Sequence, residues 1–76
     1  MSTTKQILNY IIKEKSQGDA FQELNIQMKI MMKGVNVKGI MEDKLSDELT
    51  NALNEKLKSI AEEFKIDLQI MGNSHG

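Results

Sequence analysis

The feature that most constrains this chain is a long apolar stripe in its C-terminal half. Large apolar side chains recur there every three or four residues, at Leu45, Leu49, Leu53, Leu57, Ile60 and Phe64. This spacing matches the helical period and predicts a helix of about five turns. Asp43 and Ser46 are candidate N-caps, and Asp47 and Glu48 place negative charge in the first turn, where the helix dipole favours it.

A shorter amphipathic helix is predicted near the N-terminus, over residues 4 to 16. Thr3 followed by Gln6 fits a capping box, in which each side chain accepts a hydrogen bond from an otherwise unpaired backbone N–H. One apolar stripe follows, made of Ile7, Leu8, Ile11 and Ile12. Gly18 stands just beyond the stripe, as expected after a helix end.

Residues 24 to 33 fit two patterns, and the choice between them decides the fold class. Taken in alternation, one face carries Leu24, Ile26, Met28, Ile30 and Met32. Taken at helical spacing, a stripe is formed by Phe21, Leu24, Met28, Met31 and Met32, and Gly34 then fits a helix C-cap. The intrinsic propensities of Gln, Met, Lys, Glu and Leu favour the helix, although propensity is a weak guide.

The segment after the long helix favours the strand interpretation. Ile66, Leu68 and Ile70 alternate with polar residues, so residues 66 to 71 are predicted to form a strand. A strand needs a partner for its backbone groups, and residues 24 to 33 can supply one. In "VNVKGIM", Val35 and Val37 share one face of a further short strand, with Gly39 as a bulge or strand end.

The predicted fold class is therefore α+β, in one small domain over residues 1 to 76, with residues 72 to 76 as a flexible tail. The element order is helix, strand, strand, helix, strand. A right-handed crossover puts both helices on one face of a three-stranded sheet. The alternative is an all-α three-helix bundle with residues 20 to 33 as its middle helix.

Length and composition point towards a partner. A chain of 76 residues buries only about 60% of its unfolded surface, so its stability is marginal without help. Cysteine is absent and His75 is the sole histidine, so neither disulfides nor a histidine-rich metal site supplies that help. The formal net charge is −1, and no stretch has the pattern of a signal peptide or membrane span. We expect a cytoplasmic protein that dimerises or binds another protein.

The residues available for chemistry indicate a protein that is not an enzyme and needs no cofactor or metal. His75 lies in a polar terminal stretch, so Ser46 and Ser59 have no histidine to activate them. An acidic cluster is formed by Glu42, Asp43, Asp47 and Glu48. It lacks the glycine-containing pattern of a calcium loop and is interpreted as helix-start electrostatics. "KGVNVKG" lacks the lysine followed by serine or threonine of a phosphate-binding loop.

The outer face of the predicted sheet is the candidate partner surface. It would carry Gln27, Lys29, Met31, Lys33, Asn36, Lys38, Asp67 and Gln69. Lysines keep such a face soluble, but solubility does not explain methionines, which adapt well to partner surfaces. The predicted partner-binding residues are Lys29, Met31, Lys33, Lys38 and Met71. The expected function is a small protein-interaction or regulatory module that acts as a homodimer or through a protein partner, without a small-molecule substrate.

Nucleic-acid binding is the alternative function. The stretch "VKGIMEDKLSDELTNALNEKL" loosely resembles the strand-into-helix segment of the YbaB-type nucleoid-associated proteins, over about a quarter of the chain and without a diagnostic residue. The resemblance implies a dimer on DNA. Lys29, Lys33 and Lys38 would contact phosphates, although no aromatic side chain stands among them for base stacking.

Overall fold

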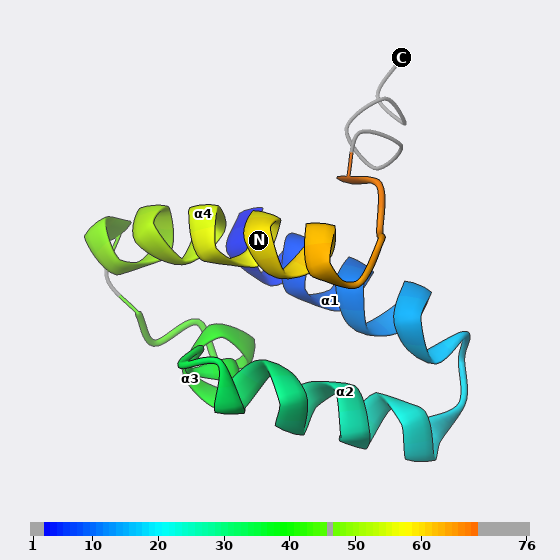
Figure 1. The fold of residues 1–76 in the computed structure, drawn as a ribbon. Helices are drawn as coiled ribbons and strands as arrows, with labels where there is room; N and C mark the ends of the chain where they lie inside the picture. The colour runs from blue at the N-terminus through cyan, green and yellow to red at the C-terminus, as the bar shows by residue number, and fades with distance from the viewer. Residues whose placement is uncertain (1–2, 46, 69–76) are drawn as a thin grey trace.

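Every regular element in the described part of the chain is a helix (Figure 1). The computed structural model describes residues 3–45 and 47–68. The helices are α1 (Thr3–Ser16), α2 (Ala20–Met32), α3 (Val37–Met41) and α4 (Asp47–Glu63). α1 packs against α2, α3 and α4, while α2 also packs against α3. The described chain is therefore an all-α arrangement built around α1.

The α+β prediction is wrong, and the all-helical alternative fits. Residues 24 to 33 lie in α2 and its C-cap, so the first predicted strand is helical. Val37 starts α3, where the second strand was predicted. Residues 66 and 67 follow α4 without strand structure, while residues 69 to 71 lie outside the described residues. The described residues thus form no sheet and present no outer sheet face.

Local capping explains why α2 is a helix. The Asp19 carboxylate accepts hydrogen bonds from the backbone N–H groups of Phe21, at 2.9 Å, and Gln22, at 3.4 Å. At the other end Gly34 has a φ of 94°, and its N–H donates to the Met31 carbonyl at 2.9 Å. An N-cap acceptor and a left-handed glycine are strong helix boundaries. Between them, good helix formers prevail over the alternating pattern.

α3 is a short helix that Asn36 caps at its N-terminus. The Asn36 side-chain oxygen accepts from the Gly39 N–H at 3.0 Å, which caps the first turn. Gly39 is buried, and a Cβ added there would lie 2.6 Å from Asn36 Nδ2. Close approach, rather than the predicted strand bulge, therefore accounts for glycine at this position.

The two predicted amphipathic helices are confirmed as α1 and α4. α4 ends in a Schellman motif, with Lys65 in the left-handed region at a φ of 61° and the Ile66 N–H bonded to the Ala61 carbonyl at 2.8 Å. This turn ends the helix before residue 66. The predicted N-cap Ser46 lies outside the described residues. The other candidate, Asp43, has a φ of 55° just after α3 and lies four residues before Asp47, the first residue of α4.

One core cluster joins all four helices. Its buried apolar members are Ile7, Leu8, Ile11, Ile12, Ile26, Ile30, Val35, Val37, Ile40, Leu57, Ile60 and Ala61. A buried polar link supplements it, because the Thr4 hydroxyl donates a hydrogen bond to the Asn54 side-chain oxygen and so joins α1 to α4. The predicted tail at 72 to 76 lies outside the described residues.

Membrane crossing requires a long and apolar helix, and none of the helices in the described ranges meets both conditions.

Candidate functional site

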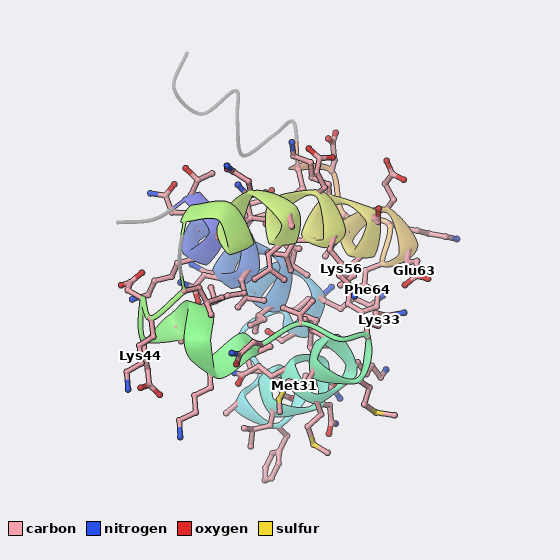
Figure 2. All side chains as sticks on the ribbon, turned by 90° about the vertical axis from the view of Figure 1, so that its left-hand side faces the viewer. Met31, Lys33, Lys44, Lys56, Glu63 and Phe64 are labelled. Atoms are coloured by element: carbon pink, nitrogen blue, oxygen red, sulfur yellow. The ribbon has the colours of Figure 1, made fainter. Side chains whose placement is uncertain are left out.

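Large apolar side chains that are exposed to solvent gather on the outer face of α2. Five large apolar side chains on this helix are between 54% and 85% exposed: Phe21, Leu24, Met28, Met31 and Met32. Figure 2 shows sulfur-bearing side chains projecting from α2, on the side of the molecule away from α4. We call these five residues the α2 outer face. Single exposed apolar residues are ordinary, but a contiguous set marks an interaction surface.

The opposite face of α2 is also apolar. Ile26 and Ile30 are buried against the core, at 3% and 0% exposure. At about 100° per residue, Met28 lies roughly 200° around the helix from Ile26 and so on the far side. A helix that is apolar on both faces is typically buried on both. In the isolated chain only one face of α2 is covered.

The spacing of the exposed residues is that of a coiled-coil seam. Phe21, Leu24, Met28 and Met31 follow one another at three, four and three residues, which matches the a and d positions of two heptads. Ala20, Asn25 and Gln27 flank this seam and carry no charge. The α2 outer face is therefore shaped to receive another helix.

The structure divides the predicted partner-binding residues among different surroundings. Met31 belongs to the α2 outer face, and Lys29 is an exposed residue of the same helix. Lys33 forms an ion pair with Glu63, and Lys38 is exposed on α3. Met71 lies outside the described residues. The predicted cluster of lysines and methionines on a sheet face is therefore not formed by the described residues.

Sequence reasoning missed Phe21, Leu24, Met28 and Met32 as surface residues. The helical stripe that contains them is visible in the sequence, but an apolar stripe ordinarily indicates the core side of a helix. The missing signal was the second apolar set, Ile26 and Ile30, which takes the core side. Two apolar stripes on opposite sides of one helix would have indicated that one faces the core and the other is an exposed partner surface.

An open hollow of about 470 Å³ lies where α1 and the end of α4 meet. Tyr10, Glu14, Phe64 and Asp67 are among its lining residues, and Lys15 Nζ stands 5.7 Å from the centre of the Phe64 ring. Partial desolvation of the half-buried Tyr10, and then the charge of Glu14, raises the pKa of Tyr10. A tyrosine held in its neutral form beside carboxylates is poorly suited to act as a base. Tyr10 is therefore not a general base in this hollow.

Two members of the acidic cluster form surface ion pairs. Asp43 Oδ2 lies 3.5 Å from Lys5 Nζ, and Glu42 Oε1 lies 2.9 Å from Lys44 Nζ. The side chains of Asp47 and Glu48 are not among those that the structure describes. Among the side chains that are described, no three histidine, aspartate or glutamate groups come together as a metal site would require.

The fold and the surface together define a small all-α domain with an exposed heptad seam. Comparison with protein-family models, with curated proteins and with solved structures finds no match to this chain. The first residues of the segment that resembles the YbaB-type proteins form α3, whereas the resemblance implies a strand there. The α2 outer face is thus the feature on which a functional proposal rests.

Proposed function

We propose that this chain is a non-enzymatic protein-interaction module that binds a helix through the α2 outer face. The observation that carries the proposal is the exposure of five large apolar side chains on one side of α2. Four of the five have heptad spacing, which favours a helical partner, because seam residues pack into the holes between the side chains of a facing helix. Three of the five are methionines, whose flexible side chains adjust to the surface they meet.

The size of the exposed set supports a binding role over simple tolerance of apolar residues. Side chains of this kind present roughly 200 Å² each when fully exposed, so the α2 outer face offers on the order of 700 Å². The largest apolar patch on an ordinary monomer covers about 300 to 600 Å² and is often functional. A 76-residue chain without disulfides also benefits when a partner covers such a surface.

Peptide binding tests this function directly. A fluorescent amphipathic peptide with leucine at its a and d positions serves as the probe, and its anisotropy is followed as protein is added. We expect saturable binding to the wild-type chain and at least a tenfold weaker affinity for Met31→Glu, because the new charge is desolvated in the contact. Gln22→Glu is the matched control, since it adds the same charge to an exposed position of α2 outside the seam. Equal binding by all three proteins would contradict the proposal.

Nucleic-acid binding is the second candidate, supported by one observation. Lys29 and Lys38 are exposed, and neither forms an ion pair with another described residue. The sheet face that was expected to align them with Lys33 is not formed by the described residues. The test is a mobility shift with mixed-sequence DNA and RNA at several salt concentrations. Phosphate contacts release counterions, so affinity should fall steeply with salt if this candidate holds.

The remaining expectations accompany the main proposal. A helix-binding module of this kind needs no cofactor or small-molecule substrate. Its lack of cysteine suits a reducing compartment, and we propose a cytoplasmic location on that ground. A regulatory role follows if the bound partner changes state on binding. Fractionation of the source cells with an antibody to the chain would test the location.

A further inference from the structure

We infer that the helix received by the α2 outer face is α2 of a second copy of this chain, packed antiparallel across a two-fold axis. This inference rests on the proposed function and names its partner. The contact would be isologous, so the same residues of each copy form both sides of it. Two observations favour a second copy: the area of the face and the neutral flanks of the seam.

The area of the face suits a dimer. A standard specific interface covers about 800 Å² on each partner, and the α2 outer face presents on the order of 700 Å² of apolar side chain. Polar side chains at its rim, such as Asn25 and Gln27, would add to that area. One helix face therefore comes close to supplying a complete interface without a second contact region.

The helix dipoles favour the antiparallel arrangement. The charged residues of α2 lie away from the seam, and Asp19 and Lys33 are already engaged, as the N-cap of α2 and as the ion-pair partner of Glu63. In an antiparallel pair the positive end of each helix dipole lies beside the negative end of the other. A parallel pair would place like ends of the two dipoles together, so the antiparallel orientation is the favourable one.

The flanks of the seam permit this pairing. Charged residues at the e and g positions of a coiled coil normally select a partner by attraction or repulsion. Here those positions hold Ala20, Asn25, Gln27 and Met32. An identical copy consequently meets no like charge beside the seam, and a partner with a charged e or g row would find nothing to match it.

The antiparallel geometry also places large apolar side chains of the two copies opposite one another. The midpoint of the seam falls between Leu24 and Met28, so a two-fold axis there places Leu24 opposite the partner's Met28 and Phe21 opposite the partner's Met31. Large and flexible side chains then face one another along the whole contact. In this arrangement Phe21 of one copy lies roughly 15 Å from Phe21 of the partner subunit along the helix axis.

Sedimentation velocity on the full chain over a concentration series tests the dimer. The wild-type chain should sediment as a dimer that dissociates on dilution. Met28→Glu should raise its dissociation constant by at least about 100-fold, because a two-fold contact buries the new charge twice. Gln22→Glu is the control, and its dissociation constant should stay within about threefold of the wild-type value. A wild-type monomer at every concentration, or a dimer unaffected by Met28→Glu, would overturn the inference.

The peptide probe separates this inference from the proposed function. A wild-type monomer that still binds the amphipathic peptide, with loss of binding in Met31→Glu, would remove the homodimer and leave the interaction module standing. A monomer without peptide binding would remove both. Helical content measured by circular dichroism should be unchanged in each variant, because Met28 and Met31 are more than half exposed and outside the core.

Disulfide trapping tests the orientation, and the absence of native cysteine makes the experiment clean. Phe21→Cys and Met31→Cys are prepared as separate single variants and oxidised alone or as a mixture. The antiparallel dimer predicts rapid cross-linking only in the mixture. Rapid cross-linking of each variant alone, with no gain on mixing, would indicate a parallel pair and contradict the antiparallel arrangement.

Discussion

Lys33 at the C-cap of α2 forms an ion pair with Glu63 in the last turn of α4, so one salt bridge joins two helices that are distant in sequence (Figure 2). The two side chains remain 35% and 59% exposed, respectively. A pair so open to water is weakened by solvent and salt. Lys33 therefore has an internal partner, which reduces its value as the external contact that the sequence indicated.

A double-mutant cycle on this pair should give a small coupling energy. Lys33→Ala, Glu63→Ala and the double variant are compared by urea unfolding at one fixed protein concentration, because association would otherwise contribute. We expect a coupling of at most about 1 kcal/mol that shrinks at high salt. A coupling of several kcal/mol, insensitive to salt, would mean that the pair is far less solvated than its exposure implies.

Gly39→Ala should destabilise the fold although Gly39 lies in a helix. An added Cβ would stand 2.6 Å from Asn36 Nδ2 and 3.0 Å from Leu45 Cδ2, so the side chain that caps α3 must move. Overpacking of this kind costs about 1 to 3 kcal/mol. Chemical denaturation measures the loss, with Ser59→Ala on exposed α4 as a control expected to be neutral or slightly stabilising. A gain of about 1 kcal/mol for Gly39→Ala, as helix propensity alone would give, would contradict the packing argument.

Lys65→Gly should stabilise the chain. Lys65 holds a φ of 61° in the Schellman turn that ends α4. The left-handed region costs a side chain with a Cβ about 1 to 2 kcal/mol, and glycine recovers that energy less an entropic cost of up to about 1 kcal/mol. A net gain of roughly 0.5 to 1 kcal/mol in the free energy of unfolding is expected. The same substitution at Lys58, inside α4, should instead cost about 1 kcal/mol. Equal effects at both sites would refute the turn assignment.

Alkaline titration should reveal the raised pKa of Tyr10. Partial desolvation of its half-buried side chain, followed by the nearby Glu14 carboxylate, favours the neutral phenol in the folded state. The folded chain therefore holds this proton more tightly than the unfolded chain, whose tyrosine titrates near pH 10. This difference in the Tyr10 pKa stabilises the folded chain below about pH 10. The stabilisation is lost as the pH rises through the pKa that Tyr10 has in the folded chain.

Tyr10 is the sole tyrosine and tryptophan is absent, so ultraviolet difference absorbance follows it without interference. We expect a midpoint above that of free tyrosine, lowered in Glu14→Gln. The alkaline fall in the free energy of unfolding should also be smaller in Tyr10→Phe. A midpoint at or below that of free tyrosine would contradict the assigned environment.

The two amphipathic helices could be predicted from the sequence because each has one apolar stripe. In α4 the stripe repeats over several turns, and Leu57 and Ile60 from it are buried. In α1 the predicted residues Ile7, Leu8 and Ile11 are buried. A sustained period of this kind admits no competing strand pattern.

Residues 24 to 33 could not be assigned by periodicity, for a physical reason that also defines the candidate site. Ile26 and Ile30 face the core, while Leu24 and Met28 face solvent, so apolar residues stand on two sides of the helix. Alternation and helical spacing then both find matches. Helix propensity and the caps at Asp19 and Gly34 correctly indicate a helix over these residues. The strand predicted from residue 66 lacks the partner assigned to it, because residues 24 to 33 form α2 and its C-cap.

The measurement that tests the central claim most directly is isotope-filtered NMR on a mixture of labelled and unlabelled chains at high concentration. It detects only contacts between different copies. The antiparallel dimer predicts intermolecular cross-peaks between the Leu24 methyl groups and the ε-methyl of the partner's Met28, and between the Phe21 ring and the ε-methyl of the partner's Met31. The absence of intermolecular cross-peaks to these residues, or cross-peaks confined to other surfaces, would contradict the account.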